Sequence, residues 1–135
     1  AARYLYALPA WPACLPLDNI LTVTFATEDG RLPRGANWGA VAVDVMVPGD
    51  HVPALDFDGR RRYVAGSSYA TARVSALAAC LLAAAPYLST TTLRRNILDL
   101  ATVSPDSTRV AGGFIPLERM RARGACGLAV AMNGI

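Results

Sequence analysis

The sequence contains no lysine, and all 13 of its basic residues are arginine. This absence excludes the lysine of a phosphate-binding loop, a Schiff-base lysine and a Ser-x-x-Lys catalytic pair. Charged residues of both signs are scarce, at 17% of the chain, and the formal net charge is only +3. The arginines are dispersed and are not interleaved with aromatic residues, so we expect no nucleic-acid partner.

Cysteine is equally sparse. The three cysteines, Cys14, Cys80 and Cys126, are far apart and form no C-x-x-C pair, which argues against a zinc site. Cys80 lies in an apolar helical stretch, and we interpret it as a small buried hydrophobic residue. A disulfide, for example between Cys14 and Cys126, stays open, and with it the redox compartment.

The only histidine, His51, lies in a stretch that we predict to be a polar loop over residues 50–62. It is a candidate base for a serine, but a solvated loop histidine is the favoured interpretation. The run Asp56-Phe57-Asp58-Gly59 begins like a calcium-binding loop and then continues into three arginines. Because the later oxygen ligands are missing, we expect local Asp–Arg pairing there and no metal.

Long hydrophobic runs are also lacking. The apolar run over residues 76–85 is about half the length that a membrane span needs, and no signal peptide is visible, so we expect no membrane contact. Hydrophobic residues nevertheless make up 53% of the 135 residues. A chain so rich in core residues and so poor in charge fits a part of a larger globule, whose remainder would cover the excess apolar surface.

Local patterns predict both strands and helices. Strands are expected over residues 20–26 and 41–47, the second stopped by Pro48-Gly49, and near Phe114-Ile115. Helices are expected from Ser67 onward, over residues 93–101 with Ser89 as N-cap, and over residues 116–121. The state of residues 124–135 stays open.

One stretch combines these patterns with candidate chemistry. Gly66 ends a loop and delivers Ser67 and Ser68 to the first turn of a helix that is apolar for most of its length. A helix that is apolar all round is expected inside a core, which would hold its N-terminus rigidly. The free N–H groups and positive dipole of that end would favour a nucleophilic hydroxyl and the oxyanion that it creates. The same serines are good N-caps, and helix statistics alone favour capping.

A family resemblance changes this balance. Residues 66–76, Gly-Ser-Ser-Tyr-Ala-Thr-Ala-Arg-Val-Ser-Ala, resemble the serine motif of the subtilisin-like peptidases, G-T-S-x-A-T-P-H-V-A-G. Ser68 falls on the nucleophile and Ser67 on the threonine before it. Upstream, Asn37-Trp38-Gly39, Val43-Asp44-Val45 and Val47-Pro48-Gly49 are similar to the family's N-Y-G…V-D-V-x-A-P-G run. Downstream, residues 111–117 resemble its closing G-x-G segment.

The departures from the motif lie at Ala72, Arg73 and Ala76, which replace the family's Pro, His and Gly. They change helix packing and should leave the chemistry intact. The family's aspartate and histidine motifs, D-T/S-G and H-G-T, do not occur in the chain, and the oxyanion-hole asparagine would fall just before Ala1. The resemblance therefore implies that residues 1–135 are the C-terminal, serine-bearing part of a catalytic domain.

The resemblance also implies a subtilisin-like α/β fold, a mainly parallel sheet flanked by helices, incomplete in this chain. The implied activity is that of a serine endopeptidase, with Ser68 as nucleophile and with Ser68, Ser67 and Gly66 as oxyanion- and substrate-binding residues. It would act on a peptide or protein substrate and require no cofactor. Alone the chain should be inactive, and a complementary N-terminal segment or a second copy should cover it. The resemblance favours a secreted or periplasmic location. A catalytically inactive scaffold or protein-binding module is the alternative.

Overall fold

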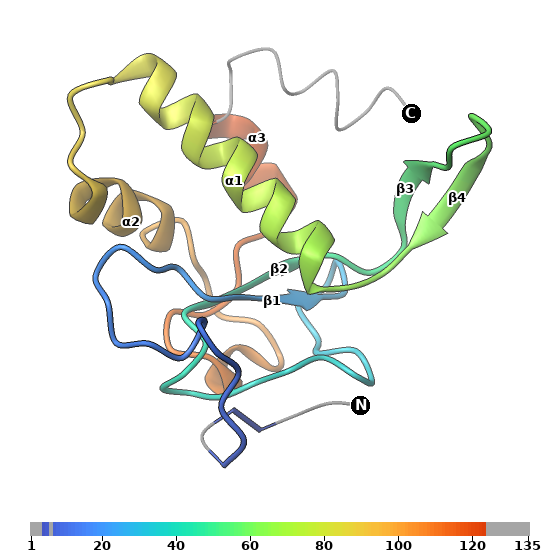
Figure 1. Cartoon of the computed structure of the whole chain (residues 1–135), viewed down its shortest axis with the longest axis horizontal. Coiled ribbons are helices and arrows are strands. Elements are labelled where there is room, and N and C mark those ends of the chain that lie inside the picture. The colour runs from blue at the N-terminus through green and yellow to red at the C-terminus, as the bar shows by residue number, and fades with distance from the viewer. Residues whose placement is uncertain (1–3, 6, 124–135) are drawn as a thin grey trace.

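The structure is a computed structural model, and it describes residues 4, 5 and 7–123. At its centre two parallel strands, β1 (Val23–Ala26) and β2 (Val45–Pro48), pair in register from Val23 opposite Val45 to Ala26 opposite Pro48 (Figure 1). The chain near Phe114 extends this sheet on the far side of β2. There the N–H of Met46 donates to Gly113 O at 3.0 Å, and the N–H of Ile115 donates to Met46 O at 3.0 Å.

Three helices lie over one face of this sheet: α1 (Ser67–Ala84), α2 (Thr90–Leu98) and α3 (Leu117–Arg123) (Figure 1). Alternate side chains of a strand point to opposite faces. Accordingly, Val45 and Val47 of β2 are buried in the cluster that contains residues of the three helices, whereas Met46 is buried in a second cluster with Phe114. The expected α/β fold with a parallel sheet and flanking helices is therefore confirmed, as a partial fold.

The strands are shorter than the sequence predicts. Strand β2 begins at Val45 rather than at residue 41, because the N–H of Val43 bonds to Gly39 O at 3.0 Å and closes a turn over the first part of the predicted strand. Helix α2 matches better: the hydroxyl of Ser89 caps it by accepting from the N–H of Thr92 at 3.2 Å. The expected N-cap is thus confirmed.

The predicted polar loop over residues 50–62 is wrong. This region is an antiparallel hairpin of β3 (Val52–Leu55) and β4 (Arg61–Val64), which projects from the body beyond the start of α1 (Figure 1). Its turn is organised by the carboxylate of Asp56, which accepts from the N–H groups of Asp58 and Arg60 at 3.0 and 2.9 Å. The same carboxylate pairs with Arg62 Nε at 2.7 Å, so the expected Asp–Arg pairing is confirmed.

The outward face of α1 is exposed, contrary to the expectation of a helix buried all round. The buried positions, Ala70, Val74, Leu77 and Cys80, recur every three or four residues and form one face. Tyr69 and Leu82 are among the residues on the exposed side. By length and composition alone α1 could cross a membrane, with 18 residues and a mean hydropathy of 1.2. The central helix of a globular domain meets the same two criteria, because both need a long apolar helix.

The bonding of the cysteines differs from what the sequence analysis expected. Cys80 is buried as expected, but it is disulfide-bonded and is not a lone thiol. Cys14 is a free thiol, so the example pairing of Cys14 with Cys126 is wrong. Cys126 and the rest of residues 124–135 lie outside the described residues.

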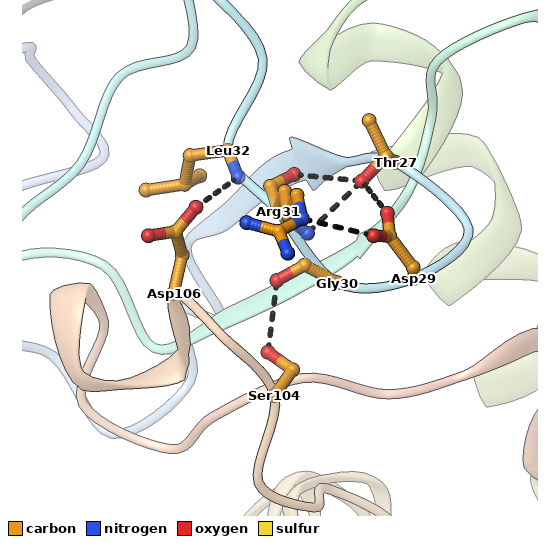
Figure 2. A network of polar contacts seen from close by, with 7 residues as sticks. All are labelled: Thr27, Asp29, Gly30, Arg31, Leu32, Ser104 and Asp106. Carbon is orange, nitrogen blue, oxygen red and sulfur yellow. Dashed lines mark hydrogen bonds and ion pairs between the residues drawn. The ribbon is translucent and has the colours of Figure 1, made fainter.

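A polar network fixes the turn that follows β1 against a distant segment (Figure 2). Gly30 O accepts from Ser104 Oγ at 2.9 Å, and the N–H of Leu32 donates to the carboxylate of Asp106 at 2.9 Å. Asp106 directly precedes the short 3-10 helix η1 (Ser107–Arg109). Gly30 has a φ of 76°, and a Cβ there would lie 2.4 Å from Ser104 Cβ, so only glycine fits the turn.

Candidate active site

Gly66 starts helix α1, and no serine caps it. Gly66 has φ 151° and ψ 163°, a conformation that is open almost only to glycine. Its carbonyl accepts from the N–H groups of Tyr69 and Ala70 at 3.1 and 3.4 Å, and no side chain caps the helix. Ser67 and Ser68 are instead the first two helical residues. The capping interpretation favoured by helix statistics is therefore wrong.

Both serines are exposed at the first turn of α1. Within the described residues, no hydrogen bond uses the N–H of Ser67 or Ser68 or either hydroxyl. These N–H groups belong to the positive end of the helix dipole. A hydroxyl placed here can attack an electrophile while the adjacent N–H groups receive the negative charge that develops.

The loop before the serines is fastened to the sheet through Gly49, the residue that follows β2. The N–H of Gly66 donates to Gly49 O at 2.9 Å, and the N–H of Gly49 donates to Ala26 O, at the end of β1, at 2.9 Å. A Cβ on Gly49 would lie 2.8 Å from Phe25 Cβ and 3.0 Å from both Ala70 Cβ and Gly66 O. The serine loop therefore packs directly on the carboxyl-terminal edge of the parallel strands.

Arg73 adds a second connection between α1 and this edge, which the sequence prediction missed. Its Nη1 donates to Pro48 O, at the end of β2, at 2.6 Å. Burial lowers the pKa of the Arg73 guanidinium, and the positive charge of Arg121 lowers it further, whereas the negative charge of Glu28 opposes the shift. The only sequence signal was that Arg73 departs from the family motif.

His51 is held on the hairpin. It has a φ of 53°, is exposed, and stacks on the ring of Tyr63 with centroids 4.0 Å apart and an interplanar angle of 14°. Within residues 4, 5 and 7–123, no hydrogen bond or ion pair joins His51 or any carboxylate to Ser68. In the part of the chain that the structure describes, no base is therefore bonded to Ser68.

A metal centre and a cavity are two other kinds of functional site. In the described part of the chain, no group of three His, Cys, Asp or Glu side chains is placed to hold a metal ion. A cavity of about 460 Å³ lies between the N-terminal segment, including Trp11 and Cys14, and the ion pair of Asp44 with Arg94. It does not include the serines, and the ion pair at its wall also joins α2 to Asp44, the residue before β2.

Several solved structures share the fold of this chain. The A-subunit of the AB5 toxin from E. coli matches with a TM-score of 0.72 and 24% identity, over 90% of this chain and 48% of that one. A cold adapted subtilisin-like serine proteinase matches with a TM-score of 0.69 and 25% identity, over 78% of this chain and 38% of that one. The chain therefore spans less than half of either structure.

A third match is the serine protease MycP1, described as an essential component of the type VII (ESX-1) secretion system. Its TM-score is 0.65 and its identity 27%, over 82% of this chain and 32% of that one. A comparison with curated proteins gives no match. The sequence model of the subtilase family, Peptidase S8, matches residues 7–116, which include both strands of the parallel sheet and the Gly66-Ser67-Ser68 turn. The chain therefore belongs to the subtilase family.

Proposed function

We propose that residues 1–135 form the C-terminal, serine-bearing part of a subtilisin-type serine endopeptidase domain, with Ser68 as its nucleophile. The observation that carries this proposal is the position of Ser68. It is exposed at the N-terminus of α1, on a loop tied to the end of β2 by the Gly66–Gly49 hydrogen bond. It also lies within the segment that matches the subtilase family.

The chemistry follows from this position. Ser68 Oγ attacks the carbonyl carbon of a peptide bond, while a histidine oriented by an aspartate takes the hydroxyl proton and returns it to the leaving amine. The N–H of Ser68 stabilises the oxyanion, with Ser67 and Gly66 beside the substrate. Water then releases the acyl group from Ser68. His51, the only histidine of the chain, stacks on Tyr63 at the hairpin, and no hydrogen bond in the described structure joins it to Ser68. In this proposal the histidine, its aspartate and the second oxyanion donor therefore come from another segment, and this chain alone is inactive.

Ser68→Ala in the longest natural form of the protein tests this proposal, with Ser67→Ala as the matched control. Peptide hydrolysis and covalent labelling by a fluorophosphonate should both be lost in Ser68→Ala, with kcat falling at least about 10⁴-fold. Ser67→Ala should reduce kcat by less than about tenfold, because it leaves the nucleophile and its N–H in place. Hydrolysis retained by Ser68→Ala would remove Ser68 as the nucleophile.

The exposed side of α1 favours a second candidate, a catalytically inactive scaffold. Apolar side chains such as Tyr69 and Leu82 are exposed there, and a complementary N-terminal segment or a second copy of the chain would cover them. Analytical ultracentrifugation of the chain distinguishes the cases. A concentration-dependent dimer supports self-association, and a stable monomer that a separate N-terminal segment shields from hydrophobic dyes supports a complementary segment. A longest natural form that is folded but never labelled by fluorophosphonate supports the scaffold.

A further inference from the structure

Arg73 donates a hydrogen bond to the carbonyl of Pro48, which lies at the end of the sheet where no neighbouring strand provides a donor. Successive residues of a parallel strand bond in turn to the neighbour on one side and the neighbour on the other. In β2 both the N–H and the carbonyl of Met46 bond to the segment of Gly113 and Ile115. The carbonyl of Pro48, two residues later, faces that same side of β2, where the chain has turned into α3. Arg73 Nη1 donates to this carbonyl at 2.6 Å, from one turn and a half into α1. Pro48 is buried, so without Arg73 its carbonyl would lack a partner.

The carbonyl held by Arg73 is next to the residue that fixes the serine loop. Pro48 is followed by Gly49, whose own carbonyl accepts from the N–H of Gly66 at 2.9 Å. Gly66 is two residues from Ser68. A displacement of the Pro48–Gly49 peptide would therefore move the acceptor that fixes the start of α1. Gly49 has little space in which to move, because a Cβ built on it would lie within 3.0 Å of atoms in β1, α1 and Gly66.

The Arg73 guanidinium is committed to this carbonyl rather than to an acid. Among the described residues it takes part in no ion pair. The charged groups that act on it are Glu28, in the turn after β1, and Arg121 of α3. A hydrogen bond from a charged donor to a neutral carbonyl is stronger than one between two neutral groups. Arg73 therefore suits a role in which a single oxygen has to be held in place.

We propose that Arg73 is a positioning residue for Ser68: it holds the carbonyl of Pro48 and so fixes Gly49, whose own carbonyl holds Gly66 and thereby positions the serine. This inference rests on the proposed function and adds to it a residue that does not touch the substrate. Geometry of the nucleophile affects kcat more than substrate affinity, since a misplacement of about 1 Å can reduce the rate about 100-fold. The KM should therefore change little.

The experiment compares four variants of the longest natural form. Arg73→Met keeps the aliphatic stem and removes the donors, and Arg73→Lys restores a cationic donor. Arg95→Met removes an exposed arginine of α2 whose side chain makes no hydrogen bond or ion pair within the described structure. Val74→Ala destabilises the adjacent turn of α1 from its buried face without touching Pro48. The readouts are kcat, KM, and the amide exchange rate of Gly66.

We expect Arg73→Met to reduce kcat about 10- to 100-fold with KM within about twofold, and to speed Gly66 amide exchange. Arg73→Lys should recover most of the lost kcat, and both controls should keep kcat within about twofold. Equal losses of kcat in Arg73→Met and Val74→Ala, or a kcat unchanged by Arg73→Met, would overturn the inference. Unchanged Gly66 exchange would overturn it whatever the activity. Failure of the proposed function is seen separately, as hydrolysis retained by Ser68→Ala.

Discussion

A single methyl group at Gly49 should test how tightly the serine loop packs on the sheet. In Gly49→Ala the new Cβ would meet Phe25 Cβ at 2.8 Å, Ala70 Cβ at 3.0 Å and Gly66 O at 3.0 Å. Ordinary contacts between carbon atoms are about 3.5–4.0 Å, so these neighbours would have to move by at least about 0.5 Å. None of them is the end of a flexible side chain. Overpacking of this kind costs about 1–3 kcal/mol of the free energy of unfolding.

Urea denaturation followed by circular dichroism measures this cost, and Gly39→Ala is the matched control. A Cβ on Gly39 would meet Ala42 Cβ at 3.5 Å and Leu5 Cβ at 3.7 Å, which are ordinary contacts. That variant should lie within about 0.5 kcal/mol of the parent or gain slightly, because alanine restricts the unfolded chain. If Gly49→Ala proved as stable as Gly39→Ala, the close packing of α1 and Gly66 on β2 would be refuted.

Two further predictions concern local side-chain chemistry. Ser89→Ala should lower the free energy of unfolding by about 1 kcal/mol, since it removes the acceptor for the N–H of Thr92, and Ser89→Asn should restore most of it in the same denaturation assay. The hydrogen bond from the N–H of Arg60, then the Arg62 side chain and the N–H of Asp58, hold the pKa of Asp56 below its ordinary 3.8. The folded hairpin therefore binds a proton less readily than the unfolded chain, so its stabilisation is complete above about pH 4 and is lost as the pH falls through the folded pKa. The amide shift of Gly59 measured against pH should show this transition, and its persistence in Asp56→Asn would contradict the assignment.

Much of the fold could be predicted because its signals are local. The alternation around β1, the N-cap at Ser89 and the glycine before the two serines each depend on neighbouring residues. The hairpin of β3 and β4 was missed for the same reason. Its strands contain Pro53 and two arginines in place of alternating apolar residues, and a side chain, that of Asp56, organises its turn.

The contacts that fix the site could not be predicted, because they join residues far apart in the sequence. The Gly66–Gly49 and Arg73–Pro48 hydrogen bonds span 17 and 25 residues, and neither has a local pattern. The exposed face of α1 could not be predicted either. Its alanines are compatible with burial on every side, and only the placement of the sheet and the other helices decides which face is covered.

The position of Ser68 follows from the topology more than from the residues of its loop. In α/β proteins, sites gather at the carboxyl-terminal edge of parallel strands, where the strands end and helices begin. Here β1 ends at Ala26 and β2 at Pro48, and the loop bonded to Gly49 opens α1 directly above them. The described chain thus fixes the position of Ser68 and of its N–H, whereas the proposed function takes its proton-transfer groups from another segment. A serine aimed by the sheet but lacking a base should react slowly with fluorophosphonate, and the rate should rise when the missing groups are supplied.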